Sequence, residues 1–205
     1  EGLGGASARN LGLTLVQGEY VSILDSDDFF EHSMLEKAVK KADETNADVV
    51  VFGGYEYDDA NGACYPAGSI LNESALPNKV VSSYRDCPKY IFQISAGMAW
   101  NKLYRRSFLE KYGVKFQRIK YTDDAYFTFS HMVLAERIAV LKDKLCYYRV
   151  NSGTNQTAGL SNYPDSSYLP YLALKESLVA WGCYRDVEQS MLNCAVAFMR
   201  YFYDK

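Results

Sequence analysis

The sequence predicts a protein of the α/β class, in which helices cover a sheet. Two observations predict it: helical and strand patterns alternate along the first part of the chain, and the first apolar strand ends in a cluster of aspartates. Such alternation is typical of parallel strands joined by crossover helices, in which ligands bind beyond the carboxyl ends of the strands. We therefore expect a ligand site directly after the first strand.

The first half of the chain reads as helix, strand, helix and strand. Ser33 and Glu36 have the spacing of a capping box, which predicts the start of the second helix. The pair Asn61-Gly62 is typical of a hairpin turn and predicts the end of the second strand. In chain order, we expect a helix over 7–16, a strand over 20–24, a helix over 33–45 and a strand over 47–57.

The second half is less regular. Ser107 and Glu110 repeat the capping-box spacing, and Lys142-Asp143 interrupts an apolar run, which predicts two strands joined by a turn. We expect short helices over 85–94 and 107–113, a helix over 124–136, the two strands within 137–150, a polar loop over 151–159, and tail helices over 166–181 and 185–203.

Composition places the chain among soluble globular proteins. Its 205 residues suit one folded unit, with 48% hydrophobic and 23% charged residues. The net charge of −3 argues against a nucleic-acid partner, because phosphate binding needs a basic surface. The five cysteines form no CxxC pair, so we expect neither a zinc site nor a disulfide framework, and we predict a reducing, cytoplasmic location.

Three carboxylates, Asp25, Asp27 and Asp28, crowd the end of the first strand. Like charges this close repel one another, and a raised pKa or a bound cation would relieve the repulsion. Carboxylate oxygens suit Mg²⁺ or Mn²⁺, which keep open positions for phosphate oxygens. The pattern therefore predicts a metal that clamps a diphosphate, although a polar turn with an aspartate as helix cap fits the spacing equally well.

Longer motifs carry a resemblance to a known family. Residues 2–39, GLGGASARNLGLTLVQGEYVSILDSDDFFEHSMLEKAV, join a glycine-rich start, an ARN segment and the DSDD strand end in one pattern. Downstream, residues 99–116 contain WNKLYR, and residues 121–127 read YTDDAYF. This set resembles family 2 glycosyltransferases of the GT-A fold, in particular bacterial members that build surface and capsular polysaccharides. The resemblance covers most of residues 1–150.

The resemblance implies a Rossmann-like mixed sheet flanked by helices. We expect a partial GT-A domain over residues 1–150 and a C-terminal helical extension packed on it over residues 151–205. The strands that open the family's domain and embrace the nucleotide have no counterpart in this sequence. We therefore expect a domain without its N-terminal part, with an exposed sheet edge that a second copy of the chain would cover as a homodimer.

The resemblance also implies a donor site. Asp25 and Asp27 would form the D-x-D motif that holds Mn²⁺ or Mg²⁺ and, through it, the diphosphate of a nucleotide sugar. Arg9 and Asn10 would approach the nucleotide, and Arg149 would reach a phosphate. Structural ion pairs explain the two arginines equally well.

The same resemblance assigns the chemistry of inverting transfer. Asp124 matches the catalytic base that deprotonates the acceptor hydroxyl, and Asp123 stands where the family has Glu. Acidic residues also stabilise a helix start by themselves, so a structural role stays open for both. Trp100 would line the acceptor pocket by stacking against sugar C–H groups, or it would belong to the core.

The implied function is that of a metal-dependent inverting glycosyltransferase of polysaccharide biosynthesis. Its partners would be a nucleotide-diphosphate sugar and a glycan or lipid-linked acceptor, with peripheral association at the inner face of the membrane. Two alternatives stay open. A non-catalytic glycosyltransferase-like module would keep the aspartates as remnants. A phosphohydrolase of the haloacid dehalogenase type would also place D-x-D after a strand, but it needs Thr or Val where this chain has Phe29.

Overall fold

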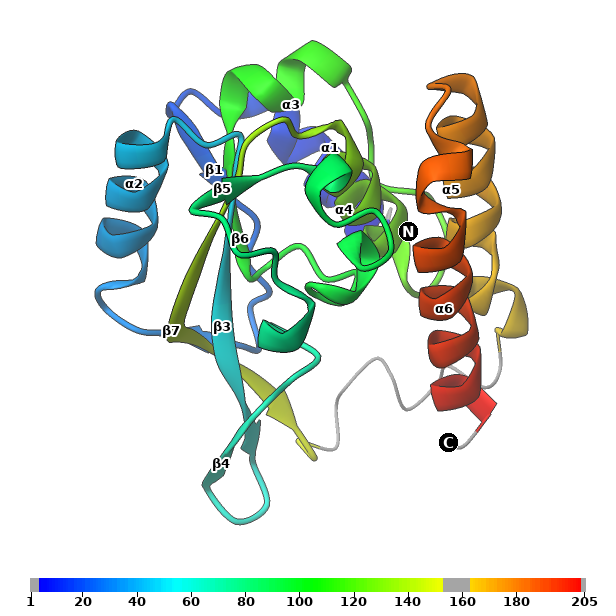
Figure 1. Ribbon diagram of the computed structural model, residues 1–205. Helices are drawn as coiled ribbons and strands as arrows, with labels where there is room; N and C mark the ends of the chain where they lie inside the picture. The colour runs from blue at the N-terminus through cyan, green and yellow to red at the C-terminus, as the bar shows by residue number, and fades with distance from the viewer. Residues whose placement is uncertain (1–3, 153–162, 204–205) are drawn as a thin grey trace.

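The computed structural model describes residues 4–152 and 163–203 of the chain. Within these residues, seven strands form one mixed sheet with helices on both sides (Figure 1). The strands are β1 (Tyr20–Ser22), β2 (Phe29–Phe30), β3 (Val49–Asp58), β4 (Ala63–Pro66), β5 (Val81–Ser82), β6 (Lys102–Arg105) and β7 (Ile138–Val150). The α-helices are α1 (Gly4–Leu15), α2 (Met34–Thr45), α3 (Arg106–Tyr112), α4 (Asp123–Leu134), α5 (Leu169–Ala180) and α6 (Tyr184–Tyr203).

The sheet confirms the predicted α/β class, but its pairing is not simply parallel. The strand order is β1-β6-β3-β7-β2, with β4 on β3 and β5 on β7. Among the described strands, β3 and β7 pair in parallel, whereas β6 runs antiparallel between β1 and β3. Leu103 of β6 pairs with Ser22 on one side and with Val50 on the other. The first two predicted strands, β1 and β3, are therefore parallel to each other, but β6 lies between them.

Helices cover the two faces of the sheet with separate apolar clusters. Alternate residues of β3 point to opposite faces: Val49 and Val51 lie in one cluster, and Val50 and Phe52 lie in the other. The first cluster contains side chains of α4, α5 and α6, and the second contains side chains of α2. Figure 1 shows α2 on one side of the sheet and α4, followed by α5 and α6, on the other. The division into two domains at residue 150 stays a prediction.

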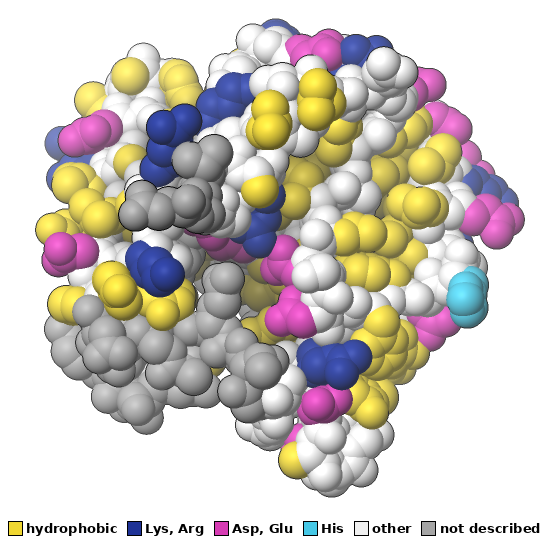
Figure 2. Space-filling model, turned by 180° about the vertical axis from the view of Figure 1, so that it is seen from behind, with side chains coloured by type: hydrophobic (Ala, Val, Ile, Leu, Met, Phe, Trp, Pro, Cys, Tyr) yellow, Lys and Arg dark blue, Asp and Glu magenta, His cyan; other side chains and the backbone are white. Residues whose placement is uncertain are grey.

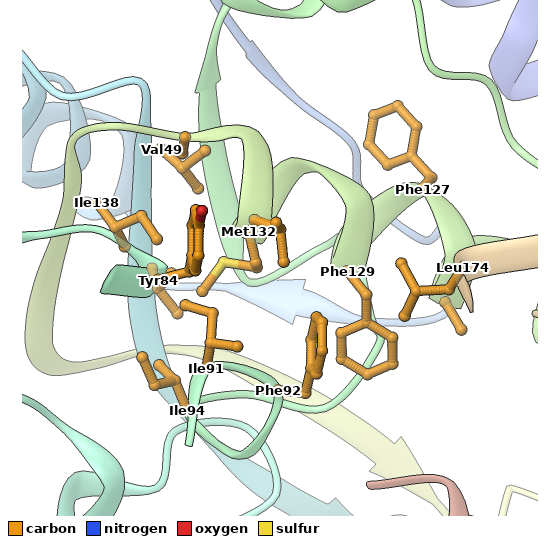
Figure 3. Packing of buried hydrophobic residues seen from close by; sticks show 14 of the residues in the cluster. Val49, Tyr84, Ile91, Phe92, Ile94, Phe127, Phe129, Met132, Ile138 and Leu174 are labelled. Carbon is orange, nitrogen blue, oxygen red and sulfur yellow. The ribbon is translucent and has the colours of Figure 1, made fainter. Parts of the chain in front are cut away.

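Aromatic packing fixes α4 against the rest of the larger cluster. Figure 3 shows Phe129 of α4 between Phe92 and Leu174, and the rings of Phe92 and Phe129 meet edge to face with centroids 5.2 Å apart. Phe127, on the same helix, stacks on Phe116 at 4.1 Å. Each such buried side chain contributes about 1.5–3 kcal/mol of hydrophobic free energy. This packing holds the first turn of α4, which carries Asp123 and Asp124, on a rigid base.

The segment 137–150 forms one strand and not the two that we predicted. In the β3–β7 ladder Phe52 pairs with Leu141 but Gly53 pairs with Lys144, so Lys142 and Asp143 are extra residues in β7. The backbone oxygen of Asp143 lies 3.0 Å from the point where a Cβ on Gly53 would stand. A glycine on β3 therefore lets the irregularity close, and the turn-like pair marks a bulge.

Most predicted helices form, but both predicted capping boxes are wrong. The helix predicted at 33–45 is α2, yet the Ser33 side chain makes no capping hydrogen bond. Ser107 lies inside α3, whose N-cap is Arg105. The short helix predicted at 85–94 is a pair of 3₁₀ turns, Tyr84–Asp86 and Ile91–Gln93. The Asn61-Gly62 hairpin is confirmed, since β3 and β4 pair across it; most of the loop predicted at 151–159 lies outside the described residues.

Candidate active site

All of the predicted site residues except Trp100 and Arg149 come from three segments that lie far apart in the sequence. These are α1, the loop 23–28 after β1, and the first turn of α4. In Figure 1, α1 and β1 lie at the back of the molecule, and Figure 2 shows the molecule from that side. Acidic side chains gather near the middle of this face, with basic and hydrophobic side chains beside them (Figure 2).

Arg9 joins two of these segments to its own helix. Its guanidinium donates one hydrogen bond from Nη2 to Asp25 Oδ1 at 2.7 Å and another from Nη1 to Asp123 Oδ2 at 2.8 Å. The guanidinium carbon also lies 5.6 Å from the centre of the Phe116 ring. The Arg9 side chain is 25% exposed, so these ion pairs are partly shielded from solvent. One arginine thus brings a predicted metal ligand and a predicted catalytic residue together.

The three aspartates after β1 form a compact group. One carboxylate oxygen from each of Asp25, Asp27 and Asp28 lies within 4.8 Å of the others, which is an arrangement that can hold a metal ion. Asp28 Oδ2 is buried and has no hydrogen-bond partner among the described residues. The pKa of Asp28 is raised to about 7, first by burial and then by the charges of Asp27 and Asp25, against a lowering by the hydrogen bond from Arg149.

These residues fit a divalent cation. The donor set is all oxygen, as Mg²⁺ and Mn²⁺ prefer, and the orphaned oxygen of Asp28 needs a positive partner. Asp25 contributes one carboxylate oxygen to this cluster, and its Oδ1 accepts a hydrogen bond from Arg9. Asp28, which the sequence pattern marks only as part of the cluster, is therefore a third carboxylate of the candidate metal site.

Arg149 packs along the same loop. Its backbone N–H donates to Asp28 Oδ1 at 2.9 Å, and its Nε donates to the backbone oxygen of Asp27 at 3.0 Å. Its Nη1 pairs with Asp59 at 3.0 Å. The structural ion pair that the sequence left open is thus present, and these contacts hold the loop against β7. A phosphate-binding role for Arg149 stays a prediction.

Asp123 and Asp124 occupy the first turn of α4. The residue before them, Thr122, has a left-handed backbone with φ of 57°, which is rare for a β-branched side chain and costs about 1–3 kcal/mol. Its hydroxyl donates to the backbone oxygen of Ser166, which anchors this conformation. The strain stands directly beside the two candidate catalytic carboxylates, as it does at many functional sites.

The environment of the first turn of α4 raises the pKa of both acids. The pKa of Asp124 is raised to about 7, first by burial and then by the neighbouring charges of Asp123 and Asp25, whereas Arg9 lowers it. Burial also raises the pKa of Asp123, against the lowering effect of its ion pair with Arg9. A carboxyl group with a pKa close to neutrality suits a general base.

Two predicted site residues have structural partners. The Asn10 amide donates to the backbone oxygen of Phe116 and accepts from its N–H, both at 2.9 Å, so it ties α1 to the segment before α4. Trp100 is 4% exposed and stacks on Tyr148 with ring centroids 5.5 Å apart. The core alternative therefore describes the surroundings of Trp100, and the donor and acceptor roles of these residues stay predictions.

The sequence of the first 113 residues decides the family. The sequence model of "Glycosyl transferase family 2" matches residues 1–113, more than half of the chain. The chain belongs to glycosyltransferase family 2. Arg9 and the aspartates after β1 lie inside the matched range, whereas Asp123 and Asp124 lie beyond its end at residue 113.

Curated relatives of the chain are bacterial proteins named as glycosyltransferases. The chain is 29% identical over 164 residues to the glycosyltransferase GlyG of Streptococcus pneumoniae, which covers 74% of this chain and 50% of GlyG. It is 30% identical over 146 residues to the poly(ribitol-phosphate) beta-N-acetylglucosaminyltransferase TarS of Staphylococcus aureus, which covers 71% of this chain and 23% of TarS. The chain thus spans half or less of the length of these relatives.

Solved structures show the fold. The crystal structure of S. aureus TarS 1–349 in complex with UDP-GlcNAc superposes with a TM-score of 0.70 at 22% identity, over 97% of this chain and 54% of that one. A mannosyltransferase of Pyrobaculum calidifontis in complex with GDP-Man and Mn²⁺ superposes with a TM-score of 0.54 at 17% identity, over 100% of this chain and 56% of that one. The predicted GT-A fold is confirmed. Across the described residues, no helix combines the length and apolarity that a bilayer crossing needs.

Proposed function

We propose that this chain carries the metal site and the catalytic base of a metal-dependent inverting glycosyltransferase of polysaccharide biosynthesis. The observation that supports the proposal is the meeting of two carboxylate groups at Arg9, which pairs with Asp25 at 2.7 Å and with Asp123 at 2.8 Å. The first group suits a cation and a diphosphate, and the second suits proton abstraction. Transfer needs both functions at the same bound donor, which explains why the carboxylates after β1 lie close to those on α4.

The transfer is a single displacement at the anomeric carbon. Asp124 takes the proton of the acceptor hydroxyl as its oxygen forms the new bond to the anomeric carbon. The bond from that carbon to the diphosphate oxygen breaks, and the nucleoside diphosphate leaves with the electron pair. Because attack and departure occur on opposite faces of the sugar, the configuration inverts. Asp123, held by Arg9, keeps the first turn of α4 beside the donor.

Asp25 and Asp27, together with Asp28, would hold Mn²⁺ or Mg²⁺ at the end of β1. When bound, such an ion neutralises the charge that grows on the leaving diphosphate. Asp27 is the exposed member of the group and is therefore open to a ligand from solvent. Arg9 holds Asp25 in place for this role.

The donor is a nucleotide-diphosphate sugar, and the acceptor is a hydroxyl of a glycan or of a lipid-linked glycan. This part of the proposal draws on the neighbours, whose structures contain UDP-GlcNAc or GDP-Man, and on TarS, whose name describes transfer to a polymer. A lipid-linked acceptor would bring the protein to the inner face of the membrane from the cytoplasm. A homodimer would cover the free edge of β1.

Calorimetry with a panel of UDP- and GDP-sugars, each with Mn²⁺, Mg²⁺ or EDTA, tests the proposal. We expect binding of at least one nucleotide sugar that requires the metal and is lost in Asp27→Ala. Asp143→Ala is the matched control, because it removes the same charge at an exposed site outside the cluster. Silence across the panel would favour the non-catalytic module, and hydrolysis of p-nitrophenyl phosphate without sugar transfer would favour the phosphohydrolase.

A further inference from the structure

A lysine is fully buried close to the candidate site. Lys102, the first residue of β6, has no exposed surface. Its Nζ donates to Ser95 Oγ at 3.0 Å, to the Met98 backbone oxygen at 2.7 Å and to Asn101 Oδ1 at 2.7 Å. An ammonium group has three N–H donors, so all of them are used. None of these partners is a carboxylate.

The partners of Lys102 belong to one segment, residues 95–101, which we call the Lys102 loop. Its last residue, Asn101, is also fully buried and donates from Nδ2 to the backbone oxygens of Phe52 at 3.1 Å and Ile70 at 2.7 Å. The loop is therefore tied to β3 by Asn101 and closed on itself by Lys102. It contains no regular helix or strand among its own residues, so these side-chain bonds take the place of a backbone ladder.

A buried cation without a carboxylate partner is costly, and an apolar side chain of similar length would fill the space with less penalty. Burial lowers the pKa of Lys102 to about 7. The group that most opposes this lowering is Asp124, followed by Cys146. The charge of Lys102 and the charge of the candidate base are thus within electrostatic reach of each other.

The Lys102 loop touches α4 at a glycine. A Cβ on Gly97 would stand 2.9 Å from both the Cα and the Cβ of Ala125 and 3.2 Å from the Phe129 ring. Ala125 directly follows Asp124. The loop backbone therefore lies flat against the turn that carries the candidate base, and no larger residue fits between them.

We propose that Lys102 is a positioning residue for the transfer reaction: by closing the Lys102 loop it seats Gly97 against Ala125 and so fixes where the Asp124 carboxylate stands. This inference rests on the proposed function, since it assigns Asp124 the role of base. The charged groups that act on Asp124 are Asp123, Asp25 and Arg9, and Asp124 in turn acts on Lys102. Lys102 touches no donor or acceptor in this scheme.

Kinetics of Lys102→Met provide the first test, with the nucleotide sugar that the donor panel selects and with water or glycan as acceptor. We expect kcat to fall between about tenfold and 100-fold, because small misplacement of a base costs this much. The donor KM and the calorimetric stoichiometry should stay at the wild-type values, since the metal site is untouched. A variant that only unfolds would lose binding stoichiometry as well, and an unchanged kcat in a folded variant would overturn the proposal.

Gly97→Ala provides a second test that leaves the Lys102 hydrogen bonds in place. The added methyl group must push the loop away from Ala125, so we expect the same fall in kcat with an unchanged donor KM. Gly68→Ala is the matched control, because a Cβ at Gly68 meets nothing within 4 Å. Wild-type kcat in Gly97→Ala would contradict the proposal.

Fluorescence of Trp100 tests the proposal without turnover. In a Trp181→Phe background, Trp100 reports on the Lys102 loop alone, since these are the two tryptophans of the chain. We expect Lys102→Met to raise acrylamide quenching of Trp100, and unchanged quenching would show that Lys102 does not hold the loop. These experiments distinguish the two ideas. Full activity in Asp124→Asn would contradict the proposed function. An inactive Asp124→Asn together with wild-type kcat in Lys102→Met and Gly97→Ala would contradict the inference alone.

Discussion

The two acidic groups of the site differ in what surrounds them. The side chain of Asp25 after β1 is 31% exposed, and Asp27 is more open still, whereas the side chain of Asp123 on α4 is 14% exposed. Carboxylates at a solvent-facing loop can exchange a cation with solution. Carboxylates at the start of a helix packed on the core keep their protons longer. Under the proposed function, a difference in burial would let the same chemical group serve metal binding in one place and proton transfer in the other.

Removal of the candidate base should have the largest effect on this comparison. In Asp124→Asn we expect the transfer rate to fall by about 10²–10⁴-fold, because general base catalysis contributes this much. Donor affinity measured by calorimetry should not change, since Asn at this position leaves the metal group intact. A variant that keeps the wild-type rate would remove Asp124 from the mechanism.

Removal of a candidate metal ligand should affect the solvent-facing aspartates after β1 and therefore donor binding. In Asp27→Ala we expect metal-dependent donor affinity to fall by about 100-fold or more, because loss of a proposed ligand should cost at least as much as loss of an outer partner of a metal. Titration with Mn²⁺ measures it, with Asp143→Ala as the control for net charge. Donor binding that no longer depends on metal but stays strong would contradict the assignment.

Arg9→Gln should shift the pH dependence of transfer, because Arg9 lowers the pKa of Asp124. The base must be ionised, so activity falls as the pH drops through its pKa. Without Arg9 that pKa rises, and the acid limb of the kcat/KM profile should move to higher pH. Each unit of such a rise costs about tenfold in rate below the pKa. Arg9→Lys keeps the charge, so its acid limb should return close to the wild-type pH. An acid limb that does not move in Arg9→Gln would show that the charge of Arg9 does not set the pKa of the base.

The smallest expected effect is on thermal stability, and it tests whether Asp28 of the group after β1 responds to metal. The folded pKa of Asp28 is raised to about 7, so its stabilising contribution is present below about pH 4 and is lost as the pH rises through 7. In EDTA, Asp28→Asn should therefore unfold a few degrees above the wild type at pH 8 but not at pH 4. Added Mn²⁺ should raise the wild-type Tm at pH 8 and cancel the difference. Thermal unfolding at both pH values measures this, and equal Tm values at pH 8 would contradict it.

Local patterns predict those parts of the fold that depend on neighbours in sequence. The helix after Ser33 and the hairpin at Asn61-Gly62 form where expected, because periodicity and turn chemistry are local. The position of β6 could not be read in this way. Leu103 pairs with residues about fifty and eighty positions away, and no local pattern records such a partner. Capping boxes failed for a related reason, since spacing does not fix the rotamer of Ser33.

The site was predictable as a set of residues but not as an arrangement. Motif resemblance named Arg9, Asp25 and Asp123, yet nothing in the sequence pairs Arg9 with an aspartate 114 positions away. The burial of Lys102 was equally hidden, because lysine is almost always exposed and a single sequence gives no sign of the exception. The left-handed backbone of Thr122 was also not predictable, because a threonine gives no local signal for a positive φ.

Because a single guanidinium serves both acids, neither acid can change without consequence for the other. Substitutions at Asp25 and Asp123 should be non-additive, since each alters the partner that the other has left. Under the proposed function, a change in the loop after β1 that removes the Asp25 partner of Arg9 would also alter the surroundings of the candidate base on α4.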